Sequence, residues 1–276
     1  MSSKTPTVSI YGDLAIYHKV TKTLTTKTKA KKLEAFKAWL KSGMHGTLED
    51  LKSLLKLKGE NTKMRASLSA EEQFVEVYIL PAWWVTNPPS DFKGRINEGE
   101  LSACESACPH RHDNYKREGV SSCYVNAVYQ IIPAAAQAAK DYESGATWDM
   151  SPSYKLRLTA WGDVSRLSPL GLDHIESLLF WSESHLAYTA GWRAPHMQRF
   201  KGFFQASCST VADALLAQAS GWQPFLSVDQ GEVKRAKNFG MIQCPTDKTL
   251  PRPKALGCSV CTVGCDGSRP IVIANH

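Results

Sequence analysis

Short apolar strands alternate with amphipathic helical patterns along the chain from Cys123 onward. Four apolar segments bounded by Gly, Pro or polar residues are predicted to be strands: 155–161, 186–192, 203–209 and 224–228. Helical patterns occupy the segments 126–142, 168–185, 211–222 and 230–240. This alternation favours an α/β fold of parallel βαβ units, in an open sheet or a partial barrel. In such folds ligands bind at the carboxyl ends of the strands.

Proline positions add detail to two of these helices. Pro133 is predicted to kink or restart the first helix, and Pro169 is predicted to lie in the first turn of the second. Four apolar residues are predicted to bury one side of the second helix: Ile175, Leu178, Leu179 and Phe180.

The chain before Cys123 has a weaker pattern. Two short strands are predicted at 8–11 and 74–80, and two helices within 29–59. The segment 81–94, "PAWWVTNPPSDFKG", is predicted to be a loop because three prolines and a glycine interrupt it. Its adjacent indoles, Trp83 and Trp84, either stack on a base or planar cofactor or cover the end of the core.

Charge divides the chain into two predicted units, 1–60 and 61–276. Residues 1–58 carry twelve Lys and four acidic residues, a balance of +8 within a total of +7, so the remainder is close to neutral. We predict a basic helical N-terminal segment attached to a βα core. The segment either contacts the phosphates of DNA or RNA or is a solvated lysine-rich face.

Length and composition indicate the compartment. The 276 residues can bury a core without covalent crosslinks, and the chain shows neither a signal-like start nor a membrane-length apolar stretch. We therefore expect a soluble cytoplasmic protein. In a reducing compartment, eight cysteines are more typical of metal or redox sites than of disulfides.

The cysteines form two groups with ligand-like spacing. The C-terminal group has the spacing C-x13-C-x2-C-x3-C and comprises Cys244, Cys258, Cys261 and Cys265. Four thiolates suit either structural zinc or an iron–sulfur cluster. The earlier group has the spacing C-x3-C-x14-C and comprises Cys104, Cys108 and Cys123. Three cysteines leave one coordination position open, which is typical of reactive sites. Cys208, alone in a predicted strand, is expected to be a small core residue.

Polar residues near the predicted strand ends are candidates for a ligand pocket. Asp163 follows the strand "RLTAW" and Gly162, and Arg157 lies within that strand. These two are our candidate catalytic residues, for holding a hydroxyl, an amine or a reacting proton. Asp163 capping the following turn is the alternative. Tyr188, Thr189 and Ser207 are predicted to line the same pocket as cofactor-binding residues. The sequence contains no dinucleotide-binding, Walker, nucleophile-elbow or zinc-protease motif.

Several of these pieces together resemble the phage and plasmid proteins grouped as gene product 88 type. The resemblance covers about 61–276 and rests on the following pieces, in this order: "NTK", "CESACP", "SSCY", "RLTAWGD", "YT", "QASCS" and "CP...GCSVCTVGC...IVIANH". It implies a partial or complete βα barrel-like core, similar to that of radical S-adenosylmethionine enzymes, and iron–sulfur ligation by the two cysteine groups. The radical-enzyme motif is C-x3-C-x2-C. The longer spacing here indicates either a cluster reached by a longer loop or a cluster without radical chemistry.

Two functions follow from these observations. The first is an iron–sulfur protein with one or two 4Fe-4S clusters, in which an open iron binds S-adenosylmethionine or a substrate, with nucleic acid or a nucleotide as the substrate class. The second is a non-catalytic module that binds nucleic acid or protein, with structural zinc or iron–sulfur sites.

Overall fold

Parallel strands joined by helices form most of the part of the chain that the structure describes. The computed structural model describes these residues: 4–22, 73–91, 102–104, 106, 108, 131–149, 154–245, 247, 250 and 267–274. The strands are β1 (Lys4–Pro6), β2 (Val8–Tyr11), β3 (Leu14–Lys22), β4 (Gln73–Pro81), β5 (Thr147–Asp149), β6 (Tyr154–Trp161), β7 (Ser184–Leu186), β8 (Tyr188–Thr189), β9 (Gln205–Cys208), β10 (Gln223–Val228), β11 (Ile242–Gln243) and β12 (Ile271–Ala274). The helices are α4 (Ala82–Thr86), α7 (Ile132–Glu143), α8 (Pro169–Trp181), α9 (Val211–Ala219) and α10 (Gln230–Asn238), with the short 3₁₀ helices η2 (Val164–Arg166) and η3 (Pro195–Phe200).

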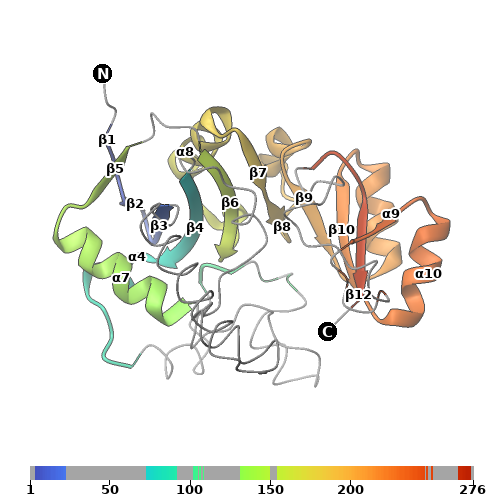
Figure 1. Cartoon of the computed structure of the whole chain (residues 1–276), viewed down its shortest axis with the longest axis horizontal. Helices are drawn as coiled ribbons and strands as arrows, with labels where there is room; N and C mark the ends of the chain where they lie inside the picture. Colours follow the sequence, from blue (N-terminus) through green and yellow to red (C-terminus); the bar gives the residue numbers. More distant parts are fainter. Residues whose placement is uncertain are drawn as a thin grey trace, which may run out of the picture.

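Two five-stranded sheets meet at one extended segment (Figure 1). The first sheet has the order β2-β3-β4-β6-β7; β4, β6 and β7 are parallel, whereas β2, β3 and β4 are antiparallel. The second, β8-β9-β10-β12-β11, is parallel throughout. Only Ala187 separates β7 from β8, and its carbonyl accepts a hydrogen bond of 2.9 Å from the N–H of Gln205 on β9. The described strands are open and do not close into a barrel.

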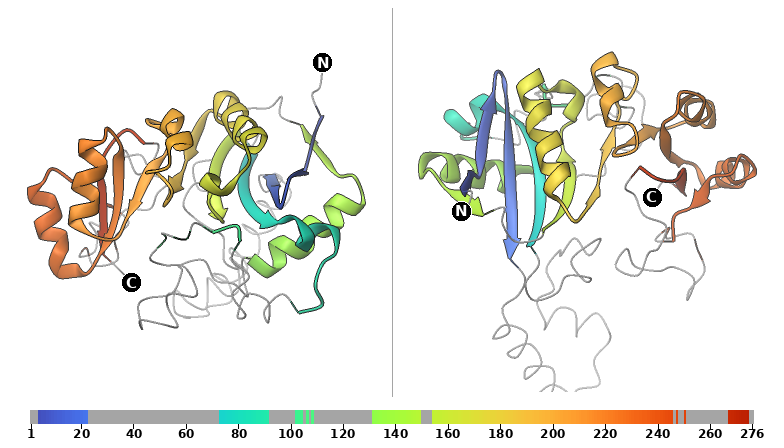
Figure 2. Two further views of the ribbon diagram at one scale, coloured as in Figure 1. Left: turned by 180° about the vertical axis from the view of Figure 1, so that it is seen from behind. Right: turned by 90° about the horizontal axis from the view of Figure 1, so that it is seen from above.

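Helices cover both faces of the first sheet: on β3, Tyr17 contacts Asp141 of α7, whereas the next residue, His18, contacts His174 of α8. The hydroxyl of Tyr154 on β6 donates to the carbonyl of Leu178 on α8 at 2.8 Å, which fixes α8 against the first sheet. In the second sheet α9 packs on β9 and β10, and α10 packs on β12 (Figure 2). Along β10, buried Leu226 and Val228 alternate with half-buried Phe225 and Ser227. One face of β10 is therefore more deeply buried than the other, as side-chain alternation in a strand requires.

Most elements predicted over the described residues are present. The parallel βαβ units are confirmed, as are strands at 8–11 and 74–80, and a helix begins beside Pro133. Several details differ. Phe180 is 77% exposed instead of buried, because it lies on the outer side of α8. Part of the predicted loop after β4 forms the helix α4. Strands β1, β3, β5, β11 and β12 were not predicted, and β7 begins within the predicted helix 168–185.

The N-terminal residues 4–22 contribute strands to the first sheet. β3 pairs with β4 over the whole of its length, from Leu14 opposite Pro81 to Lys22 opposite Gln73. The predicted basic unit 1–60 therefore begins with strands that share a sheet with the core. The two helices predicted within 29–59 lie outside the described residues.

A histidine pair, with His18 fully buried and His174 half-buried, joins β3 to α8. Nδ1 of His18 lies 3.2 Å from the carbonyl oxygen of Thr7, and Nε2 lies 3.0 Å from Nε2 of His174. Because a carbonyl only accepts, His18 carries its proton on Nδ1, and His174 then donates from Nε2. Nδ1 of His174 accepts from the hydroxyl of Tyr11 at 2.9 Å. Burial and the neighbouring His174 lower the pKa of His18 to about 3, so the pair is neutral at pH 7.

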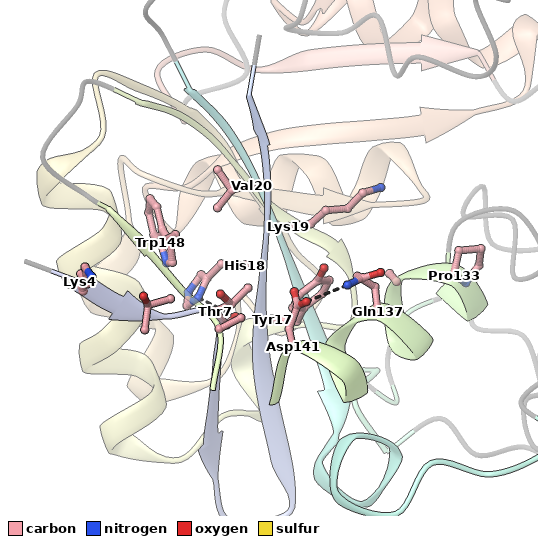
Figure 3. Close-up of a pocket in the computed structure, with 13 residues that line it drawn as sticks. Lys4, Thr7, Tyr17, His18, Lys19, Val20, Pro133, Gln137, Asp141 and Trp148 are labelled. Atoms are coloured by element: carbon pink, nitrogen blue, oxygen red, sulfur yellow. Dashed lines mark hydrogen bonds between the residues drawn. The ribbon is translucent and has the colours of Figure 1, made fainter. Parts of the chain in front are cut away.

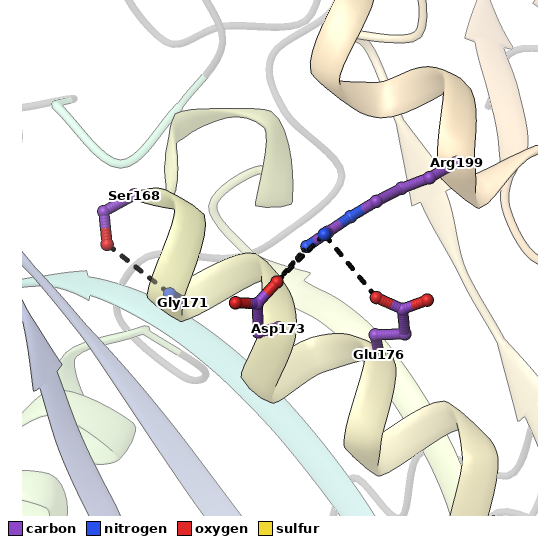
Figure 4. Close-up of polar contacts among 5 residues, drawn as sticks. All are labelled: Ser168, Gly171, Asp173, Glu176 and Arg199. Carbon is purple, nitrogen blue, oxygen red and sulfur yellow. Dashed lines mark hydrogen bonds and ion pairs between the residues drawn. The ribbon is translucent and has the colours of Figure 1, made fainter.

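Helix α8 is also fixed at its outer surface (Figure 4). Arg199 of η3 forms ion pairs with Asp173 at 2.9 Å and with Glu176 at 3.6 Å. At the start of α8, the hydroxyl of Ser168 accepts from the N–H of Gly171. In the described part of the chain, no helix has the length and apolar character that a membrane span requires.

Candidate functional site

A buried carboxylate joins the carboxyl ends of β6 and β8. Oδ1 of Asp163 accepts from the hydroxyl of Thr189 at 2.7 Å and from the N–H of Ser165 at 2.9 Å. Oδ2 accepts from the N–H of Ala190 at 2.7 Å. Burial raises the pKa of Asp163, whereas these hydrogen bonds oppose that rise. Both carboxylate oxygens are therefore occupied by donors from the ends of two neighbouring strands.

The segment that carries Cys104 lies against this same edge. The N–H of Asp163 donates to the carbonyl of Ala103 at 2.7 Å. At Gly162, where φ is +79°, an added Cβ would lie 2.6 Å from the carbonyl oxygen of Ile79 and 3.1 Å from that of Ala103. Ala103 is fully buried and Cys104 is half-buried against the core. The first cysteine of the predicted open site is thus held at the carboxyl ends of β4 and β6.

Strand β6 is distorted just before this edge. Between the pair Glu76–Arg157 and the pair Tyr78–Trp161, β4 advances by two residues and β6 by four, which makes a bulge in β6. Within it Thr159 has φ of +53°, a conformation that is costly for a β-branched residue. The Thr159 hydroxyl donates to the carbonyl of Tyr188 at 3.0 Å. Strained residues of this kind cluster at functional sites, where surrounding contacts hold them in place.

An aromatic stack borders the same ends of β4 and β6. Trp84 of α4 is fully buried, and its ring stacks on that of Trp161 with centroids 5.4 Å apart and an interplanar angle of 8°. Trp84 therefore covers the end of the core, which is one of the two roles predicted for the tryptophan pair. The neighbouring Trp83 is half-buried and meets Trp84 edge to face.

Arg157 lies away from Asp163. It forms a buried ion pair with Glu76 on β4, with Nη1 and Oε1 3.0 Å apart, and Lys19 lies 3.6 Å from the other oxygen of Glu76. Because Tyr154 faces α8, strand alternation turns Arg157 to the opposite face of the sheet. The two candidate catalytic residues are thus not brought together. Arg157 is paired with the carboxylate of Glu76, and the carboxylate of Asp163 accepts hydrogen bonds from the ends of β6 and β8.

The three predicted cofactor-binding residues divide between two places. Thr189 contacts Asp163, as described above. Tyr188 instead packs against Phe225 of β10, with ring centroids 4.6 Å apart. Ser207 lies directly opposite Phe225 in the sheet register, so it shares a face with Tyr188. Both Tyr188 and Ser207 are half-buried on the less covered face of the second sheet.

A second buried aspartate holds the beginning of the C-terminal cysteine group. Cys244 follows β11 directly, is buried, and donates its N–H to the carbonyl of Val272 at 2.8 Å. Asp247 is fully buried; its N–H donates to the carbonyl of Cys244 at 2.9 Å. Its Oδ2 accepts from the N–H of Ala274 at 3.0 Å and from the side-chain amide of Gln243 at 3.1 Å. Cys244 is therefore held at the carboxyl ends of β11 and β12.

Four of the seven predicted metal-binding cysteines lie outside the described residues: Cys123, Cys258, Cys261 and Cys265. Of the other three, Cys104 and Cys108 are half-buried and Cys244 is buried. Within the described part of the chain, no three His, Cys, Asp or Glu side chains are grouped to hold a metal ion. Cys208 is buried on β9, which confirms its predicted core position, and burial raises the pKa of its thiol to about 12.

Sequence reasoning missed Asp247, Glu76 and the strained backbone of Thr159. The segment "CPTD" carried a signal for Asp247, because proline in the second position favours a β-turn and so brings Asp247 back to Cys244. The strain at Thr159 and the pairing of Glu76 with Arg157 depend on the strand register, which no local pattern specifies.

Comparisons with protein-family models, with curated proteins and with solved structures gave no match to this chain.

Proposed function

We propose that this chain is an iron–sulfur protein in which Cys104, Cys108 and Cys123 hold a four-iron cluster with one open iron. One observation carries the proposal. The hydrogen bond from the N–H of Asp163 to the carbonyl of Ala103 holds Cys104 at the carboxyl ends of β4 and β6. That edge is where open parallel α/β sheets bind their ligands.

The described residues of this edge suit such a cluster. Sulfur ligands select iron–sulfur clusters or zinc, and half-buried thiols such as those of Cys104 and Cys108 are reachable yet shielded from water. Buried Ala103 and Trp161 supply an apolar surrounding close by, which tunes the potential of a bound cluster. When bound, a cluster with an open iron supplies an electron or a Lewis-acid position for S-adenosylmethionine or a substrate.

Residues on the less covered face of the second sheet would bind and orient a substrate. Tyr188 and Phe225 offer aromatic rings, and Ser207 offers a hydroxyl on the same face. Aromatic rings suit the bases of nucleic acid or of a nucleotide. The lysine-rich first 58 residues suit phosphates, because they carry a balance of +8. The group Cys244, Cys258, Cys261 and Cys265 would hold a second cluster or a structural zinc.

One observation favours the non-catalytic alternative. Both oxygens of Asp163 already accept hydrogen bonds, and Arg157 is already paired with Glu76. These contacts suit structural roles as well as they suit the positioning of a ligand. In that alternative both cysteine groups hold structural metal, and the chain binds nucleic acid or protein without turnover.

Anaerobic purification tests the proposal. We expect brown protein with about four iron and four sulfide per occupied cluster. Replacing Cys104 with Ala should remove one cluster, whereas the matched control Cys208→Ala should leave the iron content unchanged. A change in the electron paramagnetic resonance spectrum on adding S-adenosylmethionine would show that the open iron binds it. Colourless protein that contains only zinc, or equal iron in the two variants, would contradict the cluster site.

A further inference from the structure

Strand β3 is paired along its whole length on one edge and along only part of its length on the other. β3 pairs with β4 along all of Leu14–Lys22. On its other edge, β2 pairs only with Leu14–Tyr17. The later part of β3 therefore continues beyond the end of its neighbour. An uncovered stretch of strand edge presents backbone donors and acceptors to whatever lies beside it.

Pairing between β3 and the N-terminal segment beside it ends at Thr7. The carbonyl of Thr7 accepts from the N–H of His18 at 2.8 Å, but the N–H of Thr7 donates instead to the carbonyl of Ala146 at 2.9 Å. From there β1 pairs with β5 and not with β3. Since the N–H of His18 points away from β4, the N–H and C=O of Val20, two residues on, point to the same side. Among the described residues, no strand lies beside Val20 on that side.

A cavity of about 960 Å³ lies against this edge (Figure 3). Val20, Trp148 and Lys4 lie on one side of it, and Gln137 and Asp141 of α7 lie on the other. This volume is at the upper end of the range of ligand pockets, roughly 300–1,000 Å³. The edge of β3 thus opens into a space that can hold an extended peptide segment.

The lining favours an acidic occupant. Its one carboxylate, that of Asp141, already accepts from the side-chain amide of Gln137 at 2.8 Å and is hydrogen-bonded to the buried Tyr17. Lys4 is exposed, and Lys19, whose side chain is 42% exposed, is 3.6 Å from Glu76. Cations therefore outnumber the anions within the cavity. Val20 and Trp148 offer an apolar surface for the side chain that alternates with the acidic one.

We propose that the edge of β3 at Val20 is a docking site for an extended acidic peptide of a partner protein. The peptide pairs with the backbone of Val20 as an added strand and lies in the cavity between β3, β5 and α7. This site is on the opposite edge of the first sheet from the second sheet, and it is independent of any cluster.

Binding of a defined peptide to the full chain tests this site. The probe is an acetylated and amidated decapeptide of alternating Val and Glu, and the charge control alternates Val and Lys. We expect the acidic peptide to slow hydrogen exchange at the amide of Val20 and to bind at least tenfold more tightly than the basic one. No binding at millimolar concentration, or equal binding of the two peptides, would overturn the proposal.

Two variants separate strand pairing from simple charge attraction. Val20→Pro removes one N–H that points away from β4, so the β3–β4 ladder is retained, and binding should fall at least tenfold. Val20→Thr keeps the N–H and a side chain of similar size, so it should lose much less binding than Val20→Pro. If Val20→Pro fails to fold, Lys4→Glu on the exposed side chain should weaken acidic binding and strengthen basic binding. Val20→Pro that binds normally contradicts the site. A dimer of the wild type that Val20→Pro abolishes would show that a second copy occupies the edge, which also contradicts it.

Discussion

Two segments that carry cysteines begin at the same edge of the sheets, and a buried aspartate holds each of them differently. Asp163 reaches across the fold: it joins the ends of β6 and β8 and binds Ala103, sixty residues earlier in the chain. Asp247 acts locally, through a turn back to Cys244 and a contact with the end of β12. The first cysteine segment therefore depends on the assembled sheet, whereas the second is defined by its own turn and one adjacent strand.

A large effect is expected at the glycine beside Asp163. Gly162→Ala should destabilise the protein by on the order of 3 kcal/mol or more, since its Cβ would meet two backbone carbonyls as well as adopt a left-handed conformation. Gly240 is the matched control. Its φ is +81° and nothing lies within 4 Å of an added Cβ, so Gly240→Ala should cost only about 1–2 kcal/mol. Urea unfolding measures the free energy of unfolding of both variants, and equal losses would show that the close approach of Gly162 to Ile79 and Ala103 does not matter.

Replacing each aspartate separates the two segments. Asp163→Ala leaves three buried donors unsatisfied, each worth about 1–3 kcal/mol. The backbone N–H of residue 163 remains, but the loosened turn around it should hold the segment of Cys104 less firmly. Asp247→Ala should instead loosen the segment of Cys244. The rate of thiol alkylation, measured by mass spectrometry on the metal-free protein, should rise several-fold at the matching cysteine and little at the other. Parallel increases at both cysteines in either variant would contradict independent anchoring.

A change of pH tests a different region, the His18 contact between β3 and α8. His18 has its pKa lowered to about 3 in the folded state from an ordinary value near 6.5, so the folded state binds its proton less readily than the unfolded chain does. The stabilisation is complete above about pH 6.5 and is lost as the pH falls towards 3, by up to about 1.4 kcal/mol per pH unit.

The matched variant is His18→Gln, which can still donate to Thr7 and accept from His174 but does not titrate. The unfolding free energy of His18→Gln should decline less steeply than that of the wild type between pH 6.5 and 4. Identical slopes would place the acid sensitivity elsewhere.

Local patterns predicted the elements of the parallel half well. Apolar runs bounded by Gly and Pro marked β9 and β10, and Pro169 marked the first turn of α8. They failed where a tertiary contact decides. Phe180 matched the apolar spacing of α8 yet lies on its outer side, and the four residues of β12 are too short a run to separate from a loop.

The candidate site was predictable in part. Asp163 was placed at the end of a strand, which the structure bears out, and its proximity to Thr189 follows from strands ending at one edge. The alternation of a strand explains why Arg157 faces away, but the bulge at Thr159 changes the register between them and leaves no trace in the local pattern. Register is set by pairing with β4, which lies about eighty residues earlier in the chain.

The continuous run through Ala187 links the two sheets more tightly than their separate strand orders suggest. Its first half pairs with β6 and its second half with β9, so one backbone segment sets the register of both sheets. A shift of this register by one residue would move the side chains of the segment to the opposite face of each sheet. The six residues Ser184–Thr189 therefore set the position of the segment held by Asp163 relative to the segment held by Asp247.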